Sequence, residues 1–591
     1  ILAGIGGVRA VRLFCQLTGH PEPEVCHTNE GHAGFLGLER IRVLTRSDGL
    51  GFDEALAAVR AGTVFTTHTP VPAGIDRFPV DLVRHYFGGA ILLPGVDVTR
   101  VLALGAEDDP GMFNMAHMGL RLAQRANGVS RLHGAVSRAM FRGLWPQFDV
   151  EEVPIGSVTN GVHGPTWAAR EIASLLGEPG SAAPVADTLL WDLRGALRTK
   201  LVGEVRRRVR ASWLERGASE PELGWTSQVF DPNVLTVGFA RRVPTYKRLT
   251  LMLRDPDRLR ALLLHPQHPV QLVIAGKSHP ADDGGKALIQ QIVRFADAPD
   301  VRHRIVFLPD YDMSMARYLY WGCDVWLNNP LRPLEACGTS GMKSALNGGL
   351  NLSIRDGWWD ELYDGENGWA IPTADRVEDP HRRDTLEADA LYELIATQVA
   401  PPFYDRAADG VPARWVSMVR HTLATLGTQV QASRMVQEYV ERLYAPAASS
   451  AAGVLADSFA GARALAQYRS RIHAAWPRVR VAQVDVSGLP DIPELGSEMT
   501  VRAAVVLAGL QPCDVDVQAV VGRVDDGDEL RDVLVVAMQP IGTRDGDGED
   551  QRFEATVRLP HAGLLGYTVR VLPGHPLMAS PAEFGLLHLP T

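Results

Sequence analysis

The stretch VLTVGF, residues 234–239, is the first of five short apolar runs, and helical patterns separate each run from the next. The other four runs cover residues 270–275, 305–308, 325–327 and 350–354. Short apolar runs that alternate with helices are typical of a parallel sheet with helices on both faces. Ligands of such sheets bind beyond the carboxyl ends of the strands. We therefore expect a doubly wound, Rossmann-like lobe with a binding site at that edge.

A second stretch of the same kind lies nearer the start of the chain. Residues 24–28 lead into NEGH and residues 63–67 lead into HTP, so another strand–helix lobe is expected there. After Pro477 the pattern changes to alternating apolar runs separated by Gly, Asp and Pro, which predicts a small antiparallel β-sandwich. The Ala/Ser-rich residues 445–452 are expected to be a loop between helices or a flexible joint.

These patterns predict an α/β fold with two doubly wound lobes and a C-terminal antiparallel β domain. We expect five regions along the chain. They are an N-terminal lobe (1–190), a helical connection (191–230), a second lobe (231–400), helices that pack back on the lobes (401–476) and the β-sandwich (477–591).

The composition excludes several classes of function. The 591 residues carry a net charge of −10, and no nucleic-acid partner is expected because phosphate contacts need a surplus of Lys and Arg. The 5 cysteines show no metal-ligand spacing, so no metal site is expected, and their small, odd number fits a reduced, cytoplasmic compartment. No apolar stretch approaches the roughly 18 residues that a membrane span needs, so no membrane partner is expected.

The first residues, ILAGIGGVRAVRLF, are typical of a helix inside a domain. They do not form a signal peptide, because Arg9 and Arg12 interrupt them and no small-residue cleavage site follows. Since the chain also starts at Ile1 and not at Met, we expect that it lacks its natural beginning. The alternative is a trimmed initiator followed by a compact first helix.

The strongest chemical signal is EACGTSGMK, residues 335–343. Gly338 and Gly341 permit close backbone approach, and a helix is expected to begin near Thr339. The first amides of a helix suit a phosphate group, and Lys343 lies one turn further along the same face. A phosphate at the helix start and an amine one turn later would grip both ends of pyridoxal 5′-phosphate (PLP), which binds lysine as a Schiff base. Taken alone, such a residue is more often a surface lysine.

Cations directly follow the first strand of this lobe. The run that ends at Phe239 continues, in GFARRVPTYKR, into Arg241, Arg242, Lys247 and Arg248. Several cations at the carboxyl end of a strand concentrate positive potential where an anion can bind. A basic surface loop paired with nearby acids is the alternative interpretation.

The two segments resemble motifs of the glycogen phosphorylase family. EACGTSGMK is similar to its PLP-lysine motif, and ARRVPTYKR is similar to its phosphate-binding segment. Further similar segments occur in the family's order: CHTNEGHAGF (26–35), TTHTPVPAG (66–74), MAHMGLRLAQRANGVSRLHG (115–134) and VTNGVHGPTW (158–167). The resemblance extends from residue 1 to about residue 444, and DGWWDE and DGENGW resemble the shorter bacterial branch, whose members carry a C-terminal β domain.

The resemblance implies a role for each matching residue. Lys343 matches the lysine that holds PLP, and the other cofactor contacts would be Gly338, Thr339, Ser340, Arg241, Tyr311 and Trp167. Arg242 and Lys247 match the pair that holds the substrate phosphate. Residues that match contacts to the sugar are His32, His68, Asn160, Glu335 and Cys337. The implied catalytic group is Lys343, His68, Arg242, Lys247 and Glu335.

The chain departs from the family pattern at three points. Cys337 stands where the family usually has Ser, so a thiol or the backbone replaces a hydroxyl contact to the sugar. Pro244 lies inside the phosphate segment, where it fixes φ and removes an N–H. The family's glycine-rich loop, which supplies an amide to the substrate phosphate, has no match in this chain, so we expect the N-terminal lobe to be incomplete.

The resemblance implies a GT-B type of fold and the retaining phosphorolysis of α-1,4-glucans by inorganic phosphate, which releases α-glucose 1-phosphate. Chain-length preference, homo-oligomers and allosteric control are left open. One alternative is a sugar-nucleotide glucosyltransferase of the glycogen synthase type, but those enzymes have a second Glu at the position of Lys343. The other is a glucan-binding remnant that keeps the scaffold without turnover.

Overall fold

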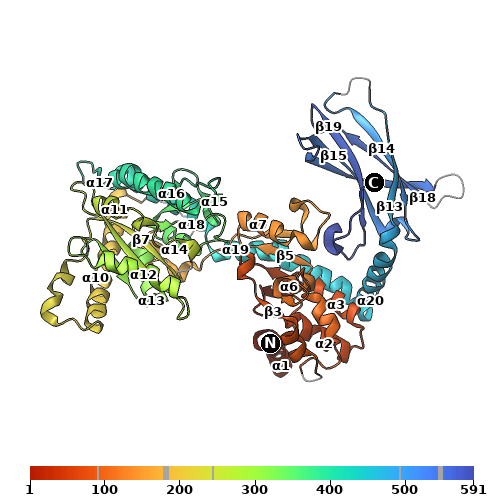
Figure 1. Cartoon of the computed structure of the whole chain (residues 1–591), viewed down its shortest axis with the longest axis horizontal. Coiled ribbons are helices and arrows are strands. Elements are labelled where there is room, and N and C mark those ends of the chain that lie inside the picture. Colours follow the sequence, from red (N-terminus) through yellow and green to blue (C-terminus); the bar gives the residue numbers. More distant parts are fainter. Residues whose placement is uncertain (90–91, 177–184, 243–244, 491–493, 544–549, 591) are drawn as a thin grey trace. The chain divides into compact units, whose positions relative to one another are not determined.

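The computed structural model describes residues 1–89, 92–176, 185–242, 245–490, 494–543 and 550–590 (Figure 1). The chain forms two compact units. The first unit comprises Ile1–Gly128, Gly134–Gly156 and Val440–Thr591, and the second comprises Val129–His133 and Ser157–Tyr439. Among the described residues, no helix is long and apolar enough to cross a membrane, and no group of three His, Cys, Asp or Glu is placed to hold a metal ion.

The second unit is built on a six-stranded sheet with the strand order β12-β11-β10-β7-β8-β9, in which all the recorded pairs are parallel. The strands are β7 (Leu235–Arg242), β8 (Val270–Lys277), β9 (Ile305–Leu308), β10 (Val325–Asn328), β11 (Leu350–Ile354) and β12 (Gly368–Ile371). The order reverses between β7 and β10, as in doubly wound folds, where ligands bind at the reversal. The five predicted runs are confirmed as β7 to β11, whereas β12 was missed.

Both faces of this sheet are buried, which explains why its strands are almost wholly apolar. Along β8, Leu272 and Ile274 belong to one apolar core, and Val273 and Ala275 belong to another. Helices lie on both sides of the sheet (Figure 1). The helices of this unit are α8 (Gly164–Trp167), α9 (Arg170–Leu176), α10 (Asp187–Glu215), α11 (Pro256–Leu263), α12 (Asp283–Ala296), α13 (Met313–Gly322), α14 (Thr339–Ala345), α15 (Trp358–Leu362), α16 (Pro380–Leu394), α17 (Ala400–Tyr404), α18 (Ala413–Gln429) and α19 (Ala432–Tyr439).

The first unit contains the sheet predicted near the start of the chain, with the order β1-β2-β5-β6. Its strands are β1 (Cys26–Asn29), β2 (Thr63–Thr66), β5 (Arg125–Gly128) and β6 (Ile155–Ser157), and the pairs β1–β2 and β2–β5 are parallel. The accompanying helices are α1 (Gly7–Thr18), α2 (Leu36–Ser47), α3 (Phe52–Ala61), α4 (Val80–Phe87), α5 (Val98–Leu104), α6 (Met115–Leu122) and α7 (Arg131–Phe141). A separate two-stranded antiparallel sheet pairs β3 (Arg77–Pro79) with β4 (Met112–Asn114), and α4 and α5 lie between these strands in the sequence.

The expected C-terminal β domain is present as two antiparallel sheets, β13-β14-β18-β17 and β16-β15-β19. Its strands are β13 (Arg480–Ser487), β14 (Glu498–Val506), β15 (Val515–Val524), β16 (Leu530–Ala537), β17 (Gln539–Thr543), β18 (Asp550–Arg558) and β19 (Leu565–Pro573). Val501 and Phe553 of one sheet and Val517 and Val571 of the other belong to a single apolar core.

The prediction of a loop or joint at residues 445–452 was wrong. These residues begin the long helix α20 (Ala445–Ala475), in which the backbone leaves helical geometry only at residues 456–459. Ala447 and Ala451 are buried, and α20 packs on α3. Alanine has the highest helix propensity, so an alanine-rich segment with a partner surface forms a helix more readily than a linker.

Candidate active site

The site in the second unit lies where the strand order reverses, at the carboxyl ends of β7 and β10. Arg241 is close to the end of β7 and Asn328 ends β10, and the Arg241 guanidinium donates a hydrogen bond to the Asn328 side-chain oxygen. The sequence predicted this edge as the binding site, and the structure places Arg241 there. The side chain of Arg242 and the whole of Pro244 lie outside the described residues.

The predicted helix start after Cys337 is confirmed. Gly338 precedes α14 with φ +83°, a left-handed conformation that favours glycine. A side chain at Gly341 would place its Cβ 2.3 Å from Asn351 Oδ1, so glycine is required for the helix to approach β11. Ser340 accepts a hydrogen bond from the Trp326 indole N–H at 3.1 Å, which attaches the first turn of α14 to β10.

Lys343 lies on α14 among aromatic rings. Its Nζ is 4.2 Å from the ring centre of Trp167 and 5.6 Å from that of Tyr320. No salt bridge or hydrogen bond joins this amine to another of the residues that the structure describes. Burial lowers the pKa of Lys343. A lowered pKa increases the fraction of neutral amine, which is the nucleophilic form that a carbonyl cofactor requires.

The rings beside Lys343 form a small network that includes predicted and unpredicted residues. The hydroxyls of Tyr311 and Tyr320 are 2.9 Å apart, and the rings of Tyr320 and Trp167 meet edge to face at 5.5 Å. Burial raises the pKa of both tyrosines, so they stay neutral. Asn347 fixes Trp167 by donating to its backbone oxygen at 3.0 Å. Tyr320 was missed because its helix position resembles an ordinary core position.

Glu335 joins the two cations of the phosphate segment. Lys247 Nζ lies 3.0 Å from both carboxylate oxygens of Glu335, and Arg241 Nη1 lies 3.6 Å from one of them. Arg241 is buried, and its Nε and Nη1 have no hydrogen-bond acceptor among the described residues. Burial lowers the pKa of Arg241, and the charge of Glu335 opposes this effect. A buried guanidinium with unsatisfied donors is a site that an anion would stabilise.

Asp356, which was not predicted, holds the backbone of Glu335 in place. Its carboxylate accepts the backbone N–H of Glu335 at 2.9 Å and that of Gly357 at 2.8 Å. Burial raises the pKa of Asp356 to about 7, although these two hydrogen bonds act against the shift. The signal in the sequence was a carboxylate two residues after the end of β11, the first residue of DGWWD.

Asn160 and Cys337 lie together in the second unit. The Asn160 backbone oxygen accepts a hydrogen bond from Arg434 at 2.9 Å, and its N–H donates to the oxygen of Val129 at 3.0 Å. Cys337 is buried, and burial raises the pKa of its thiol, so it is a neutral thiol at pH 7. The Trp358 N–H donates to the Cys337 carbonyl at 3.0 Å, which fixes the turn before α14.

His32 and His68 lie in the first unit, after β1 and β2. The unpredicted Glu30 fixes the segment of His68, because its carboxylate accepts the His68 backbone N–H at 2.5 Å and the Thr69 hydroxyl at 2.9 Å. The His68 ring contacts the Asn29 side-chain oxygen at 3.1 Å, and His32 contacts the Asn29 backbone oxygen at 3.2 Å. Burial lowers the pKa of His68, so its ring is neutral at pH 7.

The second unit is thus a doubly wound α/β fold. Its candidate site combines a lysine lined by aromatic rings with cations at the carboxyl end of a strand. Two family models match: one described as "Carbohydrate phosphorylase" over residues 11–364, and one described as "Glycogen phosphorylase C-terminal domain" over residues 476–591. The chain belongs to the carbohydrate phosphorylase family. The resemblance found in the sequence is therefore confirmed.

Three relatives illustrate the range of similarity. A glycogen phosphorylase of Mycobacterium tuberculosis is 64% identical over 607 residues, which cover 100% of this chain and 70% of the relative. A maltodextrin phosphorylase of Thermococcus litoralis is 35% identical, with 99% of this chain and 69% of the relative covered. A glycogen phosphorylase of Aquifex aeolicus is 39% identical over 71% of this chain and 62% of its own length.

Proposed function

We propose that this chain is an α-glucan phosphorylase that cleaves α-1,4-glucans with inorganic phosphate and releases α-D-glucose 1-phosphate with retention. The observation that carries the proposal is the pair of Lys343, an amine without an ionic partner, and Arg241, a buried guanidinium with unsatisfied donors. Family membership and the similarity to proteins named glycogen and maltodextrin phosphorylase support the same reaction. We further propose that the two parallel sheets correspond to the two lobes of a GT-B fold.

The residues present fit PLP. Lys343 would hold the cofactor covalently, Trp167 and Tyr311 would lie beside it, and Arg241 would contact its phosphate with the Gly338–Ser340 turn. When bound, PLP supplies a phosphate that exchanges a proton with the substrate phosphate. The unsatisfied Nε and Nη1 of Arg241 are the donors that such a phosphate would fill.

The remaining residues bind and orient the substrates. Lys247 and Arg242 would hold the substrate phosphate. Lys247 would then contact both the Glu335 carboxylate and this phosphate. Glu335, Asn160 and the backbone at Cys337 would bind sugar hydroxyls, and His32 and His68 would contact the glucose. Preorganised charges of this kind supply the largest share of many rate enhancements. A lysine at 343 disfavours the sugar-nucleotide reaction.

The proposal is tested by the absorbance spectrum of the purified protein before and after borohydride, followed by peptide mapping. We expect a near-ultraviolet cofactor band and a pyridoxyl group on Lys343. Maltodextrin and phosphate should then yield glucose 1-phosphate, whereas sugar nucleotides should not donate glucose. Label on another lysine, or glucosyl transfer from a sugar nucleotide, would contradict the assignment.

A further inference from the structure

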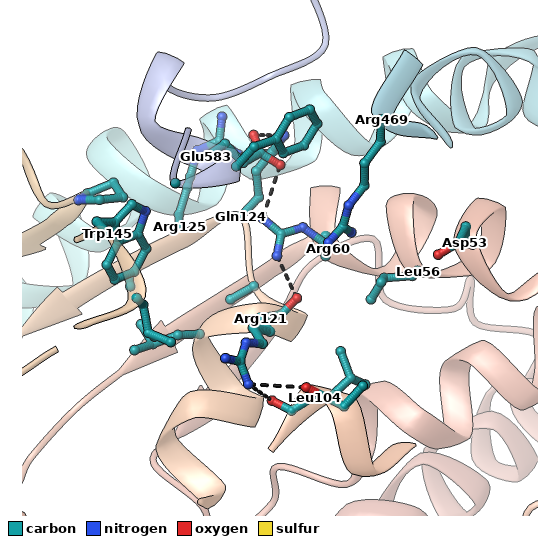
Figure 2. A pocket seen from close by; sticks show the side chains of 18 of the residues that line it. Asp53, Leu56, Arg60, Leu104, Arg121, Gln124, Arg125, Trp145, Arg469 and Glu583 are labelled. Atoms are coloured by element: carbon teal, nitrogen blue, oxygen red, sulfur yellow. Dashed lines mark hydrogen bonds and ion pairs between the residues drawn. The ribbon is translucent and has the colours of Figure 1, made fainter. Parts of the chain in front are cut away.

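A cavity of about 400 Å³ in the first unit is lined by an excess of arginines. The arginines come from α3, α5, α6, β5 and α20, and Figure 2 labels four of them. They are Arg60, Arg100, Arg121, Arg125 and Arg469. The acidic side chains in the lining are Asp53 and Glu583, so five guanidinium groups face two carboxylates and leave a net charge of +3.

Each carboxylate is already paired with one arginine. Arg60 Nη2 lies 3.1 Å from Glu583 Oε1, and Arg100 donates to Asp53. Glu583 also accepts the Gln124 side-chain amide at 3.2 Å, which uses its second oxygen. Glu583 therefore has little acceptor capacity left for the other three arginines, and in the described part of the chain the half-exposed Asp53 forms its ion pair with Arg100.

Two of these three arginines are held by neutral groups. Arg121 Nη1 donates to the backbone oxygens of Leu104 at 2.9 Å and Ala106 at 2.7 Å. Arg125 donates to the Gln124 side-chain oxygen at 3.0 Å and to the Ser450 hydroxyl at 2.9 Å. Neutral acceptors fix a guanidinium in place, but they do not cancel its charge, and burial lowers the pKa of both residues.

Arg469 has still fewer contacts. Its side chain descends from α20 toward Arg60 (Figure 2), and its guanidinium lies 5.7 Å from the ring centre of Phe584. No hydrogen bond or ion pair links it to another residue in the described part of the chain. Burial lowers its pKa and the neighbouring charge of Arg60 lowers it further, whereas the charges of Asp53 and Glu583 act against the shift. Like charges held close together in a partly buried cavity repel one another, and a bound anion would relieve that repulsion.

We propose that this cavity binds the phosphate dianion of a small molecule, either inorganic phosphate or a phosphomonoester, with Arg469 as the principal contact. Guanidinium groups pair with phosphate through two parallel hydrogen bonds, and a dianion would offset most of the net charge. The cavity volume lies within the range of small-molecule sites. None of its lining residues is a predicted active-site residue, so the inference does not rest on the proposed reaction.

The test is calorimetric titration of the full chain with inorganic phosphate, ribose 5-phosphate and, as a neutral probe, ribose. Arg469→Met should weaken the binding of at least one phosphate probe by about 10-fold or more, the scale of one charge-assisted contact. The control variant, Arg471→Met, removes the same charge from the same helix. Because Arg471 pairs with Asp514 at 2.9 Å, the affinity of this variant for the phosphate probes should stay within about twofold of that of the unaltered chain. Lys247→Ala separates this cavity from the proposed active site and should leave the Arg469-dependent binding intact.

The two phosphate sources give different results. If Arg469→Met weakens the binding of inorganic phosphate alone, the ligand is the free ion. If it weakens the binding of ribose 5-phosphate more strongly, the ligand is a phosphomonoester. Thermal unfolding provides a second measurement, because phosphate should raise the Tm of the unaltered chain and of Arg471→Met more than that of Arg469→Met. Equal binding by both arginine variants, or equal Tm shifts, would overturn the proposal.

Discussion

Lys343 and Lys247 lie at the same edge of one sheet, but their surroundings differ. Lys247 has a carboxylate partner, Glu335, at 3.0 Å, whereas the amine of Lys343 lies near the rings of Trp167 and Tyr320 and has no ion pair among the described residues. An ion pair stabilises the charged form of a lysine, and burial without an ion pair favours the neutral form. The comparison supports the proposal that Lys247 acts as a fixed charge and Lys343 as a reactive amine.

The largest effect should come from Lys343→Ala. Removal of the amine should abolish borohydride labelling and lower phosphorolysis by on the order of 1,000-fold, because this amine is the one proposed to hold the carbonyl cofactor covalently. Lys343→Arg should be nearly as inactive, although it keeps the charge. The matched control is Lys286→Ala, which removes an exposed lysine of α12 that pairs with Asp283 at 2.8 Å and should retain the activity. Labelled and active Lys343→Ala protein would contradict the assignment of Lys343 as the cofactor lysine.

A smaller loss is expected from Lys247→Ala and from Arg242→Ala. Each should reduce the rate by at least about 100-fold, the scale of one preorganised contact to the transition state. The PLP content should stay nearly full, because neither residue is proposed to hold the cofactor. Cofactor content and rate must be measured on the same samples. Full activity in both variants would remove the phosphate-binding role from this segment.

The third prediction concerns Asp356, which positions Glu335. The folded-state pKa of about 7 is above the ordinary value of 3.8, so the group adds stability at low pH that is lost as the pH rises through 7. The Asn side chain of Asp356→Asn cannot titrate, so the variant does not lose this stability. Between pH 5 and 7 the free energy of unfolding of the variant, relative to that of the unaltered chain, should therefore rise by at most about 1.4 kcal/mol per pH unit. Denaturant unfolding at several pH values measures the difference. A difference that does not vary with pH would mean that Asp356 is not protonated in the folded state.

The sequence predicted the second sheet well, because buried parallel strands are apolar along their whole length, and five of its six strands were found. It missed β12, GWAI, since four residues with a leading glycine carry little pattern. It placed Lys343 and Arg241 through local motifs and the resemblance. It could not find Tyr320, Asp356 or Glu30, because their contacts join residues that are distant in sequence.

The smallest effect should come from Trp167→Phe. The ring of Trp167 attracts the charged form of Lys343, and Trp is a better partner for a cation than Phe. The substitution keeps an apolar ring over the amine, so burial should change little, and the pKa of Lys343 should fall by less than about 1 unit, since weak cation–π contacts contribute roughly 0.5–1 kcal/mol. The pKa is measured from the pH dependence of PLP addition to cofactor-free protein, with Trp213→Phe as control because Trp213 lies against Arg216, on a different part of the unit. A pKa that rises would show that desolvation by Trp167 outweighs its attraction for the cation. In that case, the aromatic environment alone would distinguish Lys343 from the ion-paired Lys247.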